Sequence, residues 1–144
     1  MRVFLDANVL FSASNTGSSI HGLVASLKRQ SACVTNAHAT EEASRNLQAK
    51  RPAWLSEFLA LSTGIERAEV LVDVSDSGVQ DKDKPILGGA VAAHCTHLVT
   101  GDRQDFGALI GQAYRGVRIV TPKMLADELV ELGLADAPTP PPRP

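Results

Sequence analysis

Short apolar runs alternate with helical stretches along this chain, and the alternation constrains the fold more than any other feature. The runs predict buried strands at residues 3–5, 32–35, 69–74, 97–100 and 116–121. They are apolar on both faces, which is typical of parallel strands that helices cover on both sides. The pattern predicts an α/β fold, a three-layer α/β/α sandwich whose central, mostly parallel sheet has about five short strands.

Helical signals fill the stretches between these runs. Apolar spacing and capping residues predict helices over residues 20–30, 37–50, 52–64, 81–95 and 122–133. The segment 12–19, SASNTGSS, is rich in small polar residues and predicts a loop. The length of 144 residues fits one domain, which we expect at residues 1–133. The Pro-rich remainder, 134–144, is expected to be a disordered tail.

Composition narrows the classes of function. The net charge is −2, so a nucleic-acid partner would have to be held by a local basic patch or through metal ions. Cys33 and Cys95 lie in apolar contexts, which predicts buried thiols in a reducing compartment. The N-terminus lacks a signal-peptide pattern, and no apolar run reaches about 18 residues. We therefore expect a cytoplasmic protein with no membrane segment.

Acidic residues follow several of the predicted strands. They stand directly after a strand or within the next helix: Asp6, Glu41, Glu42, Asp81, Asp83, Asp102 and Asp105. In open parallel sheets the carboxyl ends of the strands form the ligand-binding edge. Carboxylates gathered there repel one another unless a cation neutralises them, and oxygen ligands suit Mg²⁺ or Mn²⁺. This arrangement favours metal-assisted hydrolysis of a phosphodiester.

Spacing separates the stronger candidates from their neighbours. Glu42 lies beside the apolar stripe of its helix and Glu41 points further from it, so Glu42 is preferred. Asp83 stands two residues before Pro85, where it can cap a helix, whereas Asp81 is expected to be solvated. Asp102 and Asp105 both fall within reach of the end of strand 97–100, so both remain candidates.

Three segments, taken in order, resemble the PIN-domain ribonucleases, the family that contains the VapC-type toxins. They are VFLDANVLFSA, EEASRNL and DKDKPILGGAVAAHCTHLVTGDRQDFG. The resemblance spans about residues 1–125. It implies a small Rossmann-like fold and a metal-dependent endoribonuclease that uses Mg²⁺ or Mn²⁺ and leaves 5′-phosphate and 3′-hydroxyl ends. It further implies a homodimer and, for a toxin, an antitoxin protein that blocks the site.

The resemblance also assigns roles by position. The catalytic and metal-binding acids would be Asp6, Glu42, Asp83 and Asp102, with Asp105 as a further metal ligand. Two polar residues would support the acids: Thr100 would support the site, and Asn8 would hold Asp6 in orientation. Independently of the family, Lys82, Lys84 and Arg103 flank the acids and can bind RNA phosphates or stay solvated. The Gly88-Gly89 pair departs from the alanine that is commoner in many toxin members, which leaves the toxin subtype open.

Other interpretations remain open at this point. Each acid has a structural alternative: a turn for Asp6, helix surface for Glu42, a helix cap for Asp83 and a loop for Asp102. The alternative function is a non-catalytic RNA-binding or regulatory module with the same fold. A third possibility is phosphomonoester hydrolysis. The segment HCTH lacks a second Cys/His pair for zinc, and no P-loop motif is present.

Overall fold

The computed structural model describes residues 1–135 of the chain. These residues form a six-stranded sheet in the order β3-β2-β1-β4-β6-β5. The strands are β1 (Arg2–Leu5), β2 (Ala32–Thr35), β3 (Glu66–Arg67), β4 (His97–Val99), β5 (Ala113–Tyr114) and β6 (Val117–Val120). All neighbouring strands pair in parallel except β5, which runs antiparallel to β6. This confirms the predicted α/β class, with one strand more than the five expected.

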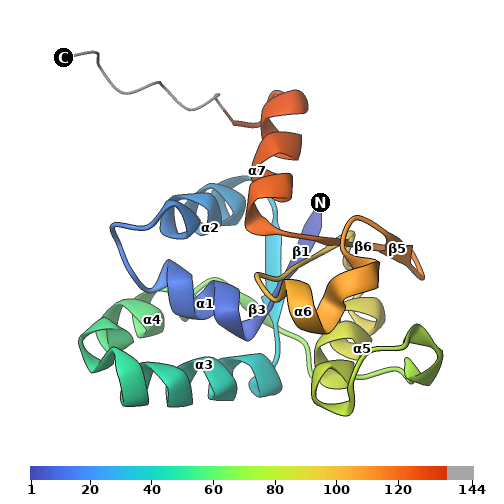
Figure 1. Ribbon diagram of the computed structural model, residues 1–144. Helices are drawn as coiled ribbons and strands as arrows, with labels where there is room; N and C mark the ends of the chain where they lie inside the picture. The colour runs from blue at the N-terminus through green and yellow to red at the C-terminus, as the bar shows by residue number, and fades with distance from the viewer. Residues whose placement is uncertain (136–144) are drawn as a thin grey trace.

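Helices connect the strands and complete the layers (Figure 1). They are α1 (Ala7–Ala13), α2 (Ser19–Gln30), α3 (Ala37–Lys50), α4 (Leu55–Ser62), α5 (Lys84–Ala92), α6 (Arg103–Phe106) and α7 (Pro122–Glu131). The chain moves from β1 to β2 and β3 in one direction, then crosses back to β4 and β6. Right-handed crossovers in opposite directions put their helices on opposite faces, so α1–α4 and α5 cover different sides of the sheet.

The centre of the molecule is aliphatic, as the low aromatic content requires. In β1, Val3, Phe4 and Leu5 are fully buried, because the strand has a neighbour on both edges and helices over both faces. Cys33 and Cys95 are buried free thiols, as predicted. No helix within residues 1–135 is long and apolar enough to cross a bilayer.

The boundary expected after residue 133 falls close to the end of the described chain. The backbone N–H groups of Leu134 and Ala135 still donate to the carbonyl of Leu129, at 2.8 and 3.2 Å. The rest of the predicted tail, residues 136–144, lies outside the described residues.

The strand expected at 69–74 is wrong. The edge strand β3 is only Glu66–Arg67, and the chain then leaves the sheet, with Val70 and Leu71 exposed. The segment instead crosses α5, where the Val72 N–H donates weakly to the Gly88 carbonyl at 3.4 Å. The apolar segment 69–74 therefore packs on helix α5 instead of pairing in the sheet, because its backbone can approach the two glycines of that helix.

Two short α-helices and one short strand were not predicted. Helix α1 begins directly after Asp6, so the predicted loop at 12–19 shrinks to residues 14–18. Helix α6 has four residues, and β5 has two. Elements this short carry too few residues for a period to show in the sequence.

Gly88 and Gly89 allow close packing around α5. A Cβ at Gly88 would stand 2.6 Å from the Val72 carbonyl oxygen, and one at Gly89 would stand 2.7 Å from the Asn36 Nδ2 atom. The two glycines are therefore required by the neighbours of α5. The cost in helix propensity is offset by the approach that they permit.

Gly88→Ala is expected to lower the free energy of unfolding by about 1–3 kcal/mol, because the Val72 backbone has to move. Gly22→Ala is the matched control, since Gly22 lies in α2 with nothing within 4 Å of an added Cβ. The control should raise stability by about 0.5–1 kcal/mol through helix propensity. Urea denaturation of both variants measures the difference, and equal stabilities would contradict this account of α5.

Candidate functional site

The candidate site lies where the chain changes direction across the sheet. Strands β1 and β4 are neighbours in space but far apart in sequence, so their carboxyl ends form a topological switch point. The Asp6 N–H donates to the Val99 carbonyl at 3.1 Å, which ties the ends of the two strands together. Ligands bind at such points in open α/β sheets.

Asp6 is held in a buried pocket at this point. It is 5% exposed. Its Oδ1 accepts from the Ala7 N–H at 2.6 Å as α1 begins, and its Oδ2 accepts from the Thr100 hydroxyl at 2.9 Å. One oxygen of the carboxylate is thus fixed by the first residue of α1 and the other by the residue that follows β4.

Asn8 and Thr100 link the end of β1 to the end of β4. The Asn8 side-chain carbonyl accepts from the Gly101 N–H at 2.8 Å, and its amide donates to the Thr100 hydroxyl oxygen at 3.4 Å. The same hydroxyl oxygen accepts from the Asp102 N–H at 3.1 Å. Thr100 therefore contacts the Asp6 carboxylate and the Asp102 backbone directly, whereas Asn8 contacts Thr100 and Gly101 between them.

Asp83 reaches the site from a separate turn, η3 (Asp81–Asp83), at the start of α5. Two residues at the start of α3 hold this turn: the Asn36 amide donates to the Pro85 carbonyl at 3.0 Å, and a His38 ring nitrogen lies 3.1 Å from the Lys82 carbonyl. Asp83 is 8% exposed. Asp81 is solvated, as the sequence predicted, and pairs with Lys84.

The cap alternative for Asp83 is wrong. Asp83 stands at the start of α5, but its side chain accepts no hydrogen bond from the helix. Its Oδ2 is buried and has no hydrogen-bond partner, the only such side-chain atom among the described residues. A buried carboxylate oxygen without a donor is costly, so this atom calls for a ligand from outside the chain.

The other acids lie around this centre. Glu42 is half-buried in the second turn of α3, and Glu41 is exposed, as the stripe of Ala39, Ala43 and Leu47 predicted. Asp102 caps α6, since its Oδ1 accepts from the Asp105 N–H at 2.8 Å.

Two of the three predicted RNA-contacting cations already have acidic partners. Lys82 pairs with Asp105, and Lys84 pairs with Asp81 at 2.7 Å. Arg103 is exposed and lines a hollow of about 500 Å³ together with Asn8 and Asp102. Of the predicted acids only Asp102 lines this hollow, so Arg103 lies on the side of Asn8 and Asp102.

The charges of the acids influence one another. Burial raises the pKa of Asp6 to about 6, against the hydrogen bonds from Thr100 and Ala7, and the carboxylates of Glu42 and Asp83 add to the rise. Burial likewise raises the pKa of Asp83 to about 6, with further increases from Asp105, Asp102 and Glu42. The pKa of Asp105 is lowered, mainly by its hydrogen bond with Lys82.

The donor set suits a hard divalent cation. Within residues 1–135, no three Asp, Glu, His or Cys side chains already surround a common point. Mg²⁺ does not need such a shell, because it keeps several waters and takes one or two carboxylates directly. The unpartnered Asp83 Oδ2 and the raised pKa values of two buried carboxyls are what a nearby cation would relieve.

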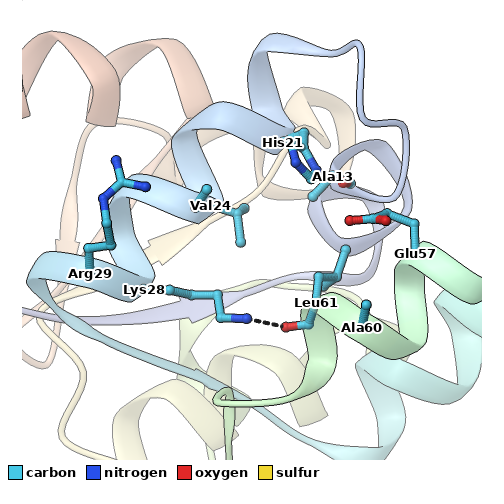
Figure 2. A pocket seen from close by; sticks show the side chains of 9 residues that line it. Ala13, His21, Val24, Lys28, Arg29, Glu57, Ala60 and Leu61 are labelled. Atoms are coloured by element: carbon cyan, nitrogen blue, oxygen red, sulfur yellow. Dashed lines mark hydrogen bonds between the residues drawn. The ribbon is translucent and has the colours of Figure 1, made fainter.

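A second hollow, of about 340 Å³, lies between α2 and α4, away from the acids (Figure 2). Two of its polar side chains, Lys28 and His21, are bound to backbone carbonyls. The Lys28 ammonium donates to Leu61 and Thr63 at the end of α4, and the His21 ring bonds to Ala13. These contacts satisfy helix ends, so they contribute to packing.

Thr100→Val is expected to lower the free energy of unfolding by about 1–3 kcal/mol, because Asp6 and the Asp102 N–H lose a buried partner. Thr40→Val is the control, since the Thr40 hydroxyl bonds only carbonyls of α3 and its start. The control should stay within about 0.5 kcal/mol of the natural chain in urea denaturation. An unchanged free energy of unfolding for Thr100→Val would mean that the hydroxyl does not support Asp6.

Lowering the pH from about 7 to about 5 is expected to make the effect of Asp6 and Asp83 on the free energy of unfolding more favourable to the folded state. Their folded pKa of about 6 exceeds the ordinary value of 3.8, so the folded state takes up protons first and is relieved of charge. Urea denaturation at both pH values measures this, with Asp6→Asn as the comparison. The gain on acidification should be smaller in Asp6→Asn; an unchanged gain would contradict the raised pKa of Asp6.

No family model and no curated protein matches this sequence. Among solved structures, the chain is similar to one in the crystal structure of VapBC2 from Rickettsia felis bound to a DNA fragment from their promoter. The TM-score is 0.60 at 14% identity, and the match covers 84% of this chain and 98% of that one. The chain therefore shares the fold of that VapBC2 chain, which confirms the PIN-like architecture that the sequence predicted.

Proposed function

We propose that this protein is a metal-dependent endoribonuclease and the toxin of a toxin–antitoxin pair. The observation that carries the proposal is the buried, unpartnered Oδ2 of Asp83 beside Asp6, at the switch point of the sheet. Repulsion between these carboxylates weakens the fold, and a bound cation would remove it. The fold shared with a VapBC2 chain supports the same proposal.

Asp6, Glu42, Asp83 and Asp102 would hold Mg²⁺ or Mn²⁺, and Asp105 is a candidate for a second ion. When bound, the ion lowers the pKa of water and neutralises charge on the phosphate. The chain itself orients Asp6 and offsets part of the effect of burial on its pKa: Thr100 donates to one oxygen and the Ala7 N–H to the other. Burial of Asp6 and Asp83 excludes bulk water and strengthens their hold on a cation.

The substrate would enter through the hollow that Asn8, Asp102 and Arg103 line. Arg103 is exposed at its rim, where a guanidinium can bind an RNA phosphate in two-point geometry. In-line attack by water on the phosphorus, with departure of the 3′ oxygen, leaves a 5′-phosphate and a 3′-hydroxyl. Because the net charge is −2, such local contacts and the ion would have to supply the attraction for RNA.

Partners and location follow from the same proposal. The similar chain belongs to a VapBC2 complex, so we propose an antitoxin protein that covers the acids of this chain, and a homodimer. An RNA substrate and two free buried thiols favour the cytoplasm.

The non-catalytic alternative is less well supported. A binding module gains nothing from a buried carboxylate oxygen that lacks a donor. Calorimetric titration with Mn²⁺ separates the two, since a binding module need take up no ion at these acids. Phosphomonoester hydrolysis is tested with a small aryl phosphate, which this proposal expects to remain uncleaved.

Asp6→Asn is expected to lower the rate of RNA cleavage by about 100-fold or more, while the domain stays folded. The amide keeps the shape of the side chain but removes the charge that attracts the ion. Cleavage of a mixed RNA substrate in Mn²⁺, followed on a gel, gives the rate, and circular dichroism checks the fold. Asp81→Asn is the matched control, because Asp81 is solvated and pairs only with Lys84; undiminished cleavage by Asp6→Asn would refute the assignment.

A further inference from the structure

Lys82 is the one lysine whose ammonium lies among the acids of the candidate site in the described chain. Its Nζ pairs with the Oδ2 of Asp105. The two side chains differ in exposure: that of Asp105 is 11% exposed and that of Lys82 is 60% exposed. The lysine therefore reaches inward from the surface turn η3 to a carboxylate that is almost covered.

The ammonium has one carboxylate in direct contact, that of Asp105. Asp102 is engaged as well, since its Oδ1 accepts from the Asp105 N–H. This half of the acid cluster, Asp102 and Asp105, is thus already supplied with a positive charge and with donors.

The other half of the cluster, Asp6, Glu42 and Asp83, has no cation in direct contact. Within the described residues the lysines nearby pair with Asp105 and Asp81 instead, and the Asp83 Oδ2 is buried without a partner. Lys84, the next lysine along, turns away to the solvated Asp81. The need for a cation is therefore concentrated on the side of Asp6 and Asp83.

We infer that the Lys82 ammonium takes the place of a second metal ion, so that the site binds one divalent cation, on the side of Asp6, Glu42 and Asp83. The inference rests on the proposed function and makes it more specific. A divalent ion on Asp105 would stand beside the ammonium, and like charges at contact distance repel strongly in a partly buried site. Lys82 is a positioning residue in this account: it holds the Asp105 carboxylate in place beside the single ion.

Titration calorimetry with Mn²⁺ alone, on the full chain near neutral pH, tests the inference. We expect one ion per chain for the natural protein and two for Lys82→Met, which keeps the length of the stem and removes the charge. Lys82→Arg should return the count to one. The double variant Lys82→Met with Asp105→Asn should also bind one ion, because the second ligand is lost.

Lys84→Met is the matched control, since its partner Asp81 is solvated; it should bind one ion. Lys82→Gln repeats the test with a second uncharged side chain, and thermal unfolding verifies that each variant is folded. Two ions on the natural chain, or one ion on both uncharged variants, would overturn the inference and leave the proposed nuclease intact. No ion on any of these proteins would overturn the metal-dependent function itself, and the inference with it.

Discussion

The parallel pairing of β1 with β4 is the constraint on which the rest of the site depends. It brings residue 6 beside residues 99–102, and the Asp6 N–H bonds to the Val99 carbonyl across the junction. Thr100 can then donate to Asp6, and Asn8 can hold Gly101. Each of these contacts spans more than 90 residues of sequence, so none of them exists before the sheet closes.

The acids divide into two halves by their partners. Asp102 and Asp105 are supplied by backbone donors and by Lys82, whereas Asp83 has a buried oxygen with no donor. Buried carboxylates in this state hold a proton more readily, which is why burial raises the pKa of Asp6 and Asp83 to about 6. Strongly shifted pKa values of this kind are typical of functional sites.

Helix α5 depends on packing contacts that cannot be predicted from its local sequence. Its two glycines lower helix propensity, yet a Cβ at either would collide with the Val72 backbone or with Asn36. The same Asn36 also holds the start of α5 through the Pro85 carbonyl, next to Asp83. The close approach at the glycines and the position of the third acid are therefore parts of one contact between α3, α5 and the segment 69–74.

The sequence by itself determined the elements whose signals are local: the cap at Asn36, the apolar stripe of α3, and the strands that run into Asp6 and Asp102. It also selected Asp83 over Asp81 and Glu42 over Glu41, in agreement with the burial of each. Tertiary structure alone decided that 69–74 covers α5, that Asp83 caps nothing, and that Lys82 faces Asp105. Periodicity and capping are properties of neighbouring residues, whereas a partner for a backbone or a charge depends on chain segments that only folding brings together.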